Sequence, residues 1–532
     1  MARYSSVSLD HIARPFGEKE RGITFVDADG DRMVLTYDEL AWRAASAGSH
    51  LQELGVVAGD RVAITIENNW QSVSLVLGVW TVGASIISLP PPRHGGMQLY
   101  EQGGSAALRS LGCKRIFGSR TLARLLGPGS EVTDINGIDF FRKVVPPDTR
   151  VEGDALIQFT SGSTASPKGV VLSAETLSGH VSNFMDHCGL EPENDRGVSW
   201  LPLCHDMGLV GCLLPGLVGR GDMILVDPRW FIRNPASWME LCAEQRATLT
   251  AGPDFAFRIA AKVDGFARLE GRLDNLNICL TGAEKVSWET MTTFAEVFED
   301  RGFAREALMP AYGMAEATLG VSFTEMGRGP RRGKRGVALG EPMPGVEVEL
   351  VDGDGSRIDE DGVEGTVRLK SPWLLDHYLT PEGEFDPRDA NGWFVTKDIA
   401  VWDEGELVVL GRSDETVIVG GRNVFAEDLE EIAVGAAGGM ALLAAAFRPS
   451  REEQSLDLVL EVVPSPDFDA QAVARAVRAS AVEALDFRPS TIAIVAPAGI
   501  PRTTSGKPRR SRCREMLANR EWTDETLLVV DS

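Results

Sequence analysis

Hydrophobic positions along the first three hundred residues alternate between helical and strand-like spacing. In residues 36–55 the apolar side chains recur three and four positions apart, which predicts an amphipathic helix. Thr36 and Glu39 are the residue types of a capping box at its start, and Gly55 is placed to end it. Residues 155–160 (ALIQFT) form a short apolar run, which predicts a buried strand. This alternation predicts an α/β domain with largely parallel strands.

The pattern changes near Arg328. Residues 327–345 are rich in Gly, Pro and Arg, which marks a loop or a subdomain crossing. Short alternating strands follow and predict a β-rich subdomain at about 328–412. The tail then reads strand, turn, helix, two strands, helix and strand, which is typical of a small α+β domain. The predicted fold class is therefore α/β, with a large N-terminal domain of α/β subdomains plus the β-rich subdomain (1–412) and a small α+β C-terminal domain (416–532).

Composition and charge narrow the function classes. The 532 residues are 43% hydrophobic and 24% charged, as in a soluble globular protein, and the net charge of −24 argues against nonspecific binding to nucleic acid. Residues 1–22 show no apolar segment of the secretory type. The apolar run 73–89 is short and interrupted by serine and glycine, so we expect a buried helix turning into a buried strand and no stable membrane insertion. Seven scattered cysteines without a C-x-x-C pair predict reduced thiols and a cytoplasmic protein, and the histidine spacing predicts no zinc site.

Residues 159–173 (FTSGSTASPKGVVLS) have the make-up of a phosphate-binding loop that follows a predicted strand. Hydroxyl donors, a glycine that admits an anion and a mobile ammonium group lie within ten positions. The pattern is not G-x-x-x-x-G-K-[ST], because Pro167 precedes Lys168 and no Ser or Thr follows the lysine. The candidate phosphate ligands are Thr160, Ser161, Gly162, Ser163, Thr164 and Lys168.

Five further residues have a chemistry that their local sequence leaves open. Glu316 would bind Mg²⁺ with Tyr312 stacking on a flat base, although a lone glutamate is more often a solvated charge. Asp398 and Arg412 lie at the ends of apolar strands, where they either bind a ribose or form a strand-end ion pair. Lys507 lies in a basic run after a strand and by itself indicates no more than a solvated charge.

Five segments in the expected order resemble the motifs of the adenylate-forming superfamily, which covers acyl-CoA synthetases, nonribosomal adenylation domains, luciferases and fatty acyl-AMP ligases. They are TSGSTASPKG (160–169), YGMAE (312–316), TKD (396–398), GRSDE (411–415) and PRTTSGK (501–507). Four others are most similar to fatty acyl-AMP ligases: WLPLCHDMGLVG (200–211), AGPDFAF (251–257), TGAEKV (281–286) and GRNVFAEDLEE (421–431). Members of that subfamily use ATP and Mg²⁺ to convert a carboxylic acid into its adenylate. They then pass the acyl group to the phosphopantetheine thiol of an acyl carrier protein.

The resemblance implies a role for each motif residue. Residues 160–168 would hold the β- and γ-phosphates, and Glu316 would bind Mg²⁺. Lys507 would be the catalytic lysine that bridges the carboxylate and the α-phosphate. Asp414 would lie in a hinge, residues 413–415, about which the C-terminal domain moves as a lid. The implied adenine and ribose contacts are Gly282, Ala283, Glu284, Tyr312, Gly313, Asp398 and Arg412, and the implied pocket residues are His205, Asp206 and Met314.

Departures from the family pattern leave the substrate and the acceptor open. Ala315 stands where many members have a threonine that donates to the α-phosphate. The chain between Glu316 and Asp398 is compact and leaves little room for the extra segment that fatty acyl-AMP ligases often carry, so CoA is the alternative acceptor. Asp206 lies where amino-acid adenylation enzymes anchor the substrate amine, which makes such an enzyme a second alternative. A non-catalytic nucleotide-binding protein fits least, because all the charged motif residues are present.

A basic run stands out on this acidic protein: Lys507, Arg509, Arg510, Arg512 and Arg514. It would dock an acidic carrier protein or the pantetheine phosphate, or else form a solvated helix face. The sequence favours neither interpretation.

Overall fold

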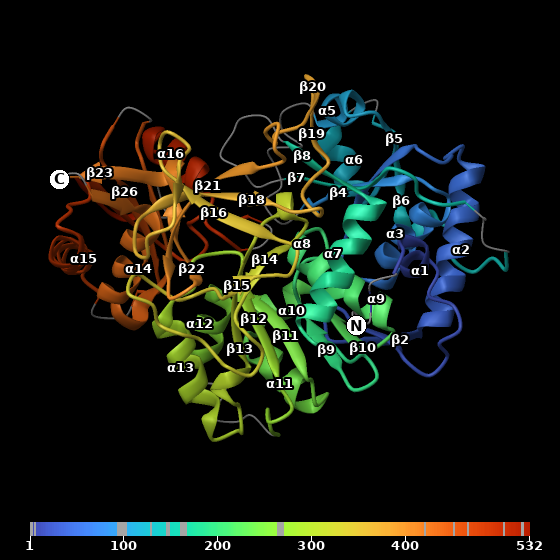
Figure 1. Ribbon diagram of the computed structural model, residues 1–532, viewed down its shortest axis with the longest axis horizontal. Helices are drawn as coiled ribbons and strands as arrows, with labels where there is room; N and C mark the ends of the chain where they lie inside the picture. Colours follow the sequence, from blue (N-terminus) through green and yellow to red (C-terminus); the bar gives the residue numbers. More distant parts are fainter. Residues whose placement is uncertain are drawn as a thin grey trace. The chain divides into compact units, whose positions relative to one another are not determined.

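A computed structural model describes residues 4, 7–92, 104–127, 130–144, 149–159, 168–262, 271–419, 422–450, 453–464, 468–503, 506–522 and 526–531 (Figure 1). The chain forms two compact units. Unit 1 comprises residues 1–348, 369–394 and 403–407, and unit 2 comprises residues 349–368, 395–402 and 408–532. Segments of the predicted β-rich subdomain therefore group with unit 2, and the domain limits near residue 412 and the hinge remain predictions.

The first sheet of unit 1 has parallel pairing at its centre. Its strands follow the order β15 (Glu341–Pro342), β14 (Gly320–Phe323), β13 (Leu308–Gly313), β12 (Ile278–Gly282), β11 (Leu249–Pro253), β9 (Arg196–Ser199), β10 (Asp222–Val226), β1 (Gly22–Val26) and β2 (Arg32–Thr36). The pairs from β13 to β1 are parallel, while β2, β14 and β15 pair antiparallel at the two edges. Because parallel strands end at the same edge of a sheet, the loops after β11, β12 and β13 lie close together.

The second sheet of unit 1 carries the predicted phosphate loop. Its strands follow the order β20 (Gly383–Phe385), β19 (His377–Thr380), β8 (Gly169–Ser173), β7 (Asp154–Phe159), β4 (Ser85–Leu89), β3 (Arg61–Thr65), β5 (Cys113–Gly118) and β6 (Val132–Asp134). The pairs from β7 to β6 are parallel, and β8, β19 and β20 add antiparallel strands. The predicted α/β class with largely parallel strands is confirmed.

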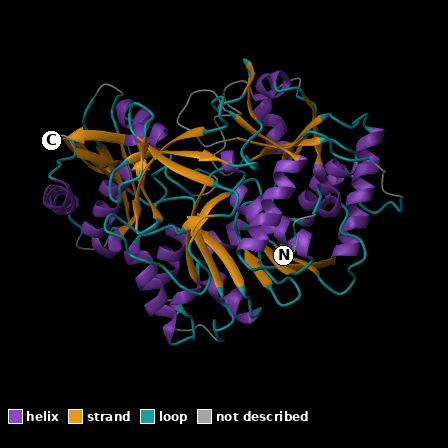
Figure 2. Cartoon of the chain, in the orientation of Figure 1, coloured by secondary structure: helices purple, strands orange, loops and turns teal. Residues whose placement is uncertain are grey.

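Helices flank both sheets of unit 1 (Figure 2). They are α1 (Leu9–Ala13), α2 (Tyr37–Glu53), α3 (Trp70–Thr81), α5 (Gly104–Ser110), α6 (Arg120–Leu126), α7 (Ala174–His187), α8 (Asp206–Gly208), the π-helical turn η2 (Leu209–Leu213), α9 (Leu214–Gly219), α10 (Pro228–Arg233), α11 (Ala236–Glu244), α12 (Asp254–Lys262) and α13 (Trp288–Glu299). The predicted capping box is present, since the Glu39 amide donates to Thr36 Oγ1 and the Thr36 amide donates to Glu39 Oε2. The run 73–89 is a buried helix followed by a buried strand, as predicted. Among the described residues, no helix is long and apolar enough to cross a membrane.

Unit 2 combines most of a five-stranded sheet with the C-terminal segment. That sheet has the order β17 (Arg357–Ile358), β16 (Glu347–Val351), β18 (Gly365–Lys370), β21 (Phe394–Asp403) and β22 (Glu406–Arg412). A hairpin follows, β23 (Thr416–Val419) and β24 (Arg422–Phe425), and then the sheet β25 (Ala441–Phe447), β26 (Asp457–Val462), β27 (Thr491–Val495) and β28 (Thr526–Asp531). The helices are α14 (Ala426–Ala436), α15 (Ala470–Leu485) and α16 (Arg510–Ala518). The predicted order of strands and helices in the α+β C-terminal segment is confirmed. The structure adds three elements that the sequence did not predict: β24, α16 and β28.

A largely buried ion cluster joins α16 to α14 inside unit 2. Arg510 Nε and Nη2 donate to the two oxygens of Glu430 at 2.7 Å each, and Arg510 Nη1 lies 3.2 Å from Glu427 Oε1. Burial alone lowers the pKa of Arg510, but these carboxylates outweigh burial and raise it. The bidentate geometry provides the match that a buried pair needs to offset desolvation.

The predicted basic run is thus largely paired within unit 2. Beyond Arg510, Arg512 Nη2 lies 2.5 Å from Glu521, and Arg514 lies 3.8 Å from Glu415 and donates to the Arg448 carbonyl at 2.6 Å. Three of the five cations therefore serve the internal structure of the unit, which neither interpretation of the sequence anticipated.

We expect Arg510→Ala to destabilise unit 2 by about 3–5 kcal/mol, because it leaves the buried Glu430 carboxylate without its cation. Amide hydrogen exchange along β25–β27 measures this unit directly, whereas whole-chain unfolding mixes two units. The matched control is Arg512→Ala, whose ion pair is more exposed and whose loss we expect to cost at most about 1 kcal/mol. Equal protection in Arg510→Ala and the wild type would contradict the assignment.

Candidate functional site

The predicted phosphate loop connects β7 to β8 of the second sheet in the chain. Thr160, Ser161, Gly162, Ser163 and Thr164 lie outside the described residues, so their role stays a prediction. Lys168 is described, directly before β8. Its Nζ lies 5.3 Å from the ring centroid of Tyr378 and 5.6 Å from that of Phe385. The lysine thus meets an aromatic pair contributed by β19 and β20.

Glu316 lies in a tight turn between β13 and β14. Its carbonyl oxygen accepts a hydrogen bond from the Leu375 amide at 2.8 Å, and its Oε1 accepts one from the Tyr378 hydroxyl at 2.7 Å. Thr318 adopts a left-handed φ of 66° and donates its hydroxyl to the Trp373 carbonyl at 2.7 Å. Segment 373–378 therefore fixes both the backbone and the side chain of this turn.

The residues before Glu316 are packed tightly. A Cβ added at Gly313 would lie 1.9 Å from the Leu319 carbonyl oxygen, so only glycine fits there. The Met314 amide donates to that same carbonyl at 2.8 Å. The ring of Tyr312 is buried at the end of β13. The close approach of residues 313 and 319 thus brings Tyr312 and Glu316, both predicted site residues, to one strand end.

The predicted adenine loop, Gly282–Glu284, follows β12. Ala283 has a left-handed φ of 67°, and Glu284 Oε1 accepts a hydrogen bond from the Phe255 amide at 2.6 Å. Fully buried Asp254 accepts from the Ser287 amide at 2.9 Å and the Thr290 hydroxyl at 3.0 Å. Burial, reinforced by the negative charge of Glu284, raises the pKa of Asp254 to about 7. Asp254 was not among the predicted residues, although it ties the start of α12 to the start of α13.

A pocket of about 700 Å³, open mouth included, lies between the first sheet and the segments α7, η2 and α9. Apolar side chains make up most of its wall, and its polar lining groups have protein partners. The Thr250 hydroxyl donates to the Val198 carbonyl and accepts from Trp238 Nε1, while Asp195 accepts from the Thr248 hydroxyl and the Glu191 amide. Lining residues include Met185, Val198, Cys212, Met223, Ala251 and Leu280.

The predicted pocket residues His205 and Asp206 lie at the start of α8, which continues into the lining segment η2. His205 Nδ1 lies 2.7 Å from Asp206 Oδ1, which also accepts from the Met207 amide at 2.7 Å. Neither residue lines the pocket, nor does Met314. Their contact with a substrate stays a prediction.

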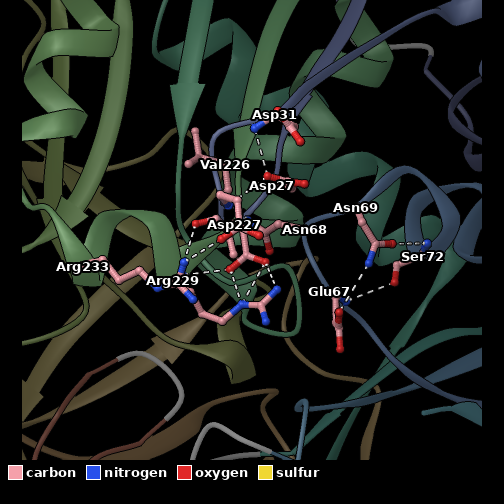
Figure 3. A network of polar contacts seen from close by, with 12 residues as sticks. Asp27, Asp31, Glu67, Asn68, Asn69, Ser72, Val226, Asp227, Arg229 and Arg233 are labelled. Atoms are coloured by element: carbon pink, nitrogen blue, oxygen red, sulfur yellow. Dashed lines mark hydrogen bonds and ion pairs between the residues drawn. The ribbon is translucent and has the colours of Figure 1, made fainter.

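Asn68 holds the segment before His205 in place, and Figure 3 shows this asparagine together with its partner Val226. Its buried amide donates to the carbonyls of Leu201 at 2.9 Å and Val226 at 2.8 Å, and its Oδ1 accepts from the Leu203 amide at 3.0 Å. Every hydrogen bond joins residues more than 130 positions apart in the chain. Sequence reasoning missed this residue because nothing local distinguishes it from any asparagine before a helix.

The predicted ribose and hinge residues lie together in unit 2. Arg412 Nη1 lies 3.5 Å from Asp398 Oδ1, and Arg412 Nε lies 3.2 Å from Asp414 Oδ1. Lys397 Nζ lies 2.8 Å from Asp414 Oδ2. Burial raises the pKa of Asp414, but the two cations outweigh it and lower that pKa below its ordinary value. A strand-end ion pair therefore exists, and binding of a ribose stays a prediction.

Lys507 lies in a loop that is closed on itself and anchored within unit 2. The Thr503 amide donates to the Lys507 carbonyl at 2.7 Å, and the Lys507 amide donates to the Thr503 hydroxyl at 3.1 Å. Buried Glu461 accepts from Arg502 Nη2 at 2.6 Å and from the Ile500 amide at 3.0 Å. The loop is therefore positioned by a carboxylate from the centre of a sheet.

The described residues include no group of three or more His, Cys, Asp or Glu side chains that would enclose a metal ion. Binding of Mg²⁺ stays a prediction; such an ion is commonly held by one or two carboxylates together with substrate phosphates and waters. Glu316 offers such a carboxylate at the strand end that also presents Tyr312.

Two solved structures have the same fold as this chain, and the first comes from a study of fatty acyl-adenylate ligases. A solved structure from a study of fatty acyl-adenylate ligases of E. coli and L. pneumophila is 25% identical, covers 98% of this chain and 99% of its own, and superposes with a TM-score of 0.84. A structure of McyG in complex with phenylalanyl-adenylate, 20% identical over 94% of this chain and 81% of its own, superposes with a TM-score of 0.82 and shows the same fold.

Residues 17–379 match the family of AMP-binding enzymes, and the chain belongs to that family of adenylate-forming ligases. The 4-hydroxyphenylalkanoate adenylyltransferase of Mycobacterium tuberculosis is 29% identical, with 94% of this chain and 89% of that protein covered. The long-chain-fatty-acid–AMP ligase FadD26 of Mycobacterium marinum is 28% identical, with 93% and 94% covered. The resemblance that the motifs indicated is confirmed.

We expect Asp254 to stabilise unit 1 at low pH and to lose that contribution as the pH rises between about 4 and 7. The pKa of Asp254 is about 7 in the folded protein, against the ordinary value of 3.8 that applies to the unfolded chain. Between these two pH values the folded state therefore holds a proton that the unfolded state has lost. One such proton gives a slope of at most about 1.4 kcal/mol per pH unit. Amide-exchange protection factors along β11–β13 at stepped pH measure unit 1 directly, and Asp254→Asn should remove this slope from them between pH 4 and 7, while exposed Asp274→Asn should leave it unchanged. An unchanged slope in Asp254→Asn would contradict this.

Proposed function

We propose that the protein uses ATP and Mg²⁺ to convert a fatty acid into its acyl-adenylate, releases pyrophosphate, and transfers the acyl group to the phosphopantetheine thiol of an acyl carrier protein. The observation that carries the fatty-acid assignment is the apolar pocket, whose polar lining groups have partners within the protein. An alkyl chain loses no hydrogen bonds there and gains about 0.8 kcal/mol for each buried methylene. The M. marinum relative that acts on long-chain fatty acids agrees with this substrate class.

The chemistry needs alignment and charge neutralisation more than proton transfer. A fatty carboxylate is already ionised at neutral pH, so its oxygen attacks the α-phosphorus without a general base. The bond from the α-phosphorus to the bridging oxygen breaks, and pyrophosphate leaves with the electron pair. Lys507 places positive charge between the carboxylate and the α-phosphate, and Lys168 with the 160–167 loop holds the leaving group. Mg²⁺, when bound at Glu316, neutralises phosphate charge.

The second half-reaction needs room for a thiol where pyrophosphate has left. We infer that the C-terminal domain, which carries Lys507, rotates about the hinge at Asp414 between the two steps. The interactions of Asp414 with Arg412 and Lys397 would then differ between the two states. The acceptor is a carrier protein on the resemblance to fatty acyl-AMP ligases, and the compact segment between Glu316 and Asp398 favours CoA as the second candidate. Amino acids fit less well, because the Asp206 carboxylate is engaged by His205 at 2.7 Å.

We expect Lys507→Ala to lower acyl-adenylate formation at least about 10²-fold while ATP still binds, since the lysine acts on charge that develops in the transition state. Pyrophosphate exchange with fatty, aryl and amino acids measures the first step, and calorimetry measures ATP binding. Lys114→Ala, on the surface beside Asp60, is the matched control. Exchange with amino acids alone would refute the substrate class, and full exchange in Lys507→Ala would refute the role of the lysine. Acyl transfer to CoA but not to holo-carrier protein would assign the other acceptor.

We expect Ala251→Phe to shorten the accepted acyl chain. Ala251 is buried on β11 and lines the pocket, so a phenyl ring there occupies space that a long chain would fill. The kcat/KM for dodecanoate should fall at least about tenfold, while that for butyrate changes by less than about threefold. Butyrate serves as the control for general damage to the fold. Equal losses for both acids would show that the pocket does not hold the acyl chain.

A further inference from the structure

The β19–β20 hairpin adjoins two predicted ATP-binding groups of unit 1. Strand β19 pairs antiparallel with β8, with Tyr378 opposite Val170 and Leu379 opposite Gly169. Gly169 directly follows Lys168, so the hairpin flanks the chain where it leaves the phosphate loop. Segment 373–375, just before the hairpin, contacts the turn that contains Glu316. A single short segment thus reaches both the loop lysine and the turn glutamate.

Two polar contacts anchor this hairpin to the sheet, and a third holds the arginine that makes one of them. Arg61 Nη2 lies 2.8 Å from both Glu384 Oε1 on β20 and Asp154 Oδ2 on β7. At the start of the hairpin, Asp376 Oδ2 accepts from the Ser173 amide at 2.7 Å. Because charged and backbone groups fix both ends, the side chains of β19 have little freedom to shift.

The hydroxyl and the ring of Tyr378 contact different groups. Its hydroxyl donates to Glu316 Oε1 at 2.7 Å, a distance typical of a hydrogen bond to an ionised carboxylate. Its ring lies 5.3 Å from Lys168 Nζ and 5.3 Å from the ring of Phe385, which itself lies 5.6 Å from Lys168 Nζ. One side chain therefore contacts both the candidate Mg²⁺ ligand and the candidate phosphate ligand.

We propose that Tyr378 is a positioning residue for the use of ATP. Its hydroxyl sets the orientation of the Glu316 carboxylate, and its ring, with that of Phe385, sets the place of the Lys168 ammonium group. This inference rests on the proposed roles of Glu316 and Lys168. Without the hydroxyl, the carboxylate loses a hydrogen bond that orients it, and Mg²⁺ must then bear part of the cost of ordering it. Without the aromatic pair, the lysine loses a cation–π contact that favours one position of its charge.

Because the hydroxyl and the ring have different roles, Tyr378→Phe and Phe385→Leu should affect different quantities: the Mg²⁺ dependence and the ATP affinity, respectively. Tyr378→Phe removes the hydroxyl and keeps the ring, so the Mg²⁺ concentration for half-maximal pyrophosphate exchange should rise about tenfold. ATP affinity without Mg²⁺ should stay within about twofold of the wild type. Phe385→Leu reduces the aromatic pair, so ATP affinity without Mg²⁺ should fall about threefold while the Mg²⁺ dependence stays unchanged. Loss of packing alone would move both quantities together in both variants.

Calorimetry provides the readout that does not depend on turnover. The dissociation constant of ATP is measured with and without Mg²⁺ for the wild type, Tyr378→Phe, Glu316→Gln and the double variant. If Tyr378 acts through Glu316, its effect on the strengthening of ATP binding by Mg²⁺ disappears in the Glu316→Gln background. Tyr4→Phe is the matched control, because it removes a tyrosyl hydroxyl that donates to the Leu190 carbonyl at 3.2 Å, outside these motifs. Melting temperatures verify that each variant is folded.

The outcomes separate the two levels of the proposal. An equal loss of Mg²⁺ response from Tyr378→Phe with and without Glu316→Gln would overturn the positioning role and leave the role of Glu316 standing. A Glu316→Gln variant with a wild-type Mg²⁺ response would refute Glu316 as the Mg²⁺ ligand and would overturn this inference with it. Non-additivity between the two substitutions, together with an unaffected Tyr4→Phe, is the result we expect.

Discussion

The antiparallel pairing of β19 with β8 is the constraint on which the ATP end of unit 1 depends. It brings residues 373–385 beside Lys168 and beside the turn that contains Glu316, although these positions are separated by more than fifty residues in the chain. Closing such long loops costs conformational entropy, which the backbone ladder and the Arg61–Glu384 ion pair help to offset. Once the hairpin is in place, the orientation of a carboxylate and the position of an ammonium group follow from one tyrosine. A small strand pair at the sheet edge therefore determines the geometry of two charged groups.

The strands of the first sheet position both the pocket and the predicted adenine loop. Strands β9, β10, β11 and β12 of the first sheet contribute residues to the pocket wall. The loops after β11, β12 and β13 lie at one edge of the same sheet, because parallel strands end on the same side. The Thr250 hydroxyl, which lines the pocket, is satisfied by Val198 and Trp238, and the Asp254 carboxyl group nearby is satisfied by Ser287 and Thr290. That satisfaction leaves the pocket apolar, which is the property that an alkyl chain requires. Asp254 achieves it with a carboxyl group whose pKa is raised to about 7.

In unit 2, buried and half-buried carboxylates support the loop that carries Lys507. Glu461, buried within β26, holds Arg502 and the Ile500 amide, and Glu430 holds Arg510 on the other side of Lys507. Two buried carboxylates thus grip the chain before and after the lysine. Replacing them with apolar side chains would retain packing but lose this fixed geometry, which is the best-supported reason for a protein to keep buried ion pairs.

Local sequence determined the elements and the chemistry of the motifs. Spacing predicted the helix that begins at Thr36 and the helix–strand pair at 73–89, because amphipathic period and capping act over a few residues. The ordered motifs identified the family for the same reason, since each is a short contiguous segment. Only the tertiary structure decided which residues line the pocket, that Asn68 braces the chain before His205, and that Tyr378 joins Glu316 to Lys168. It also decided that Arg510, Arg512 and Arg514 are paired internally rather than presented as a basic face. These contacts join residues far apart in the chain, and no pattern within a short window of sequence reports which distant charge or carbonyl a side chain will meet.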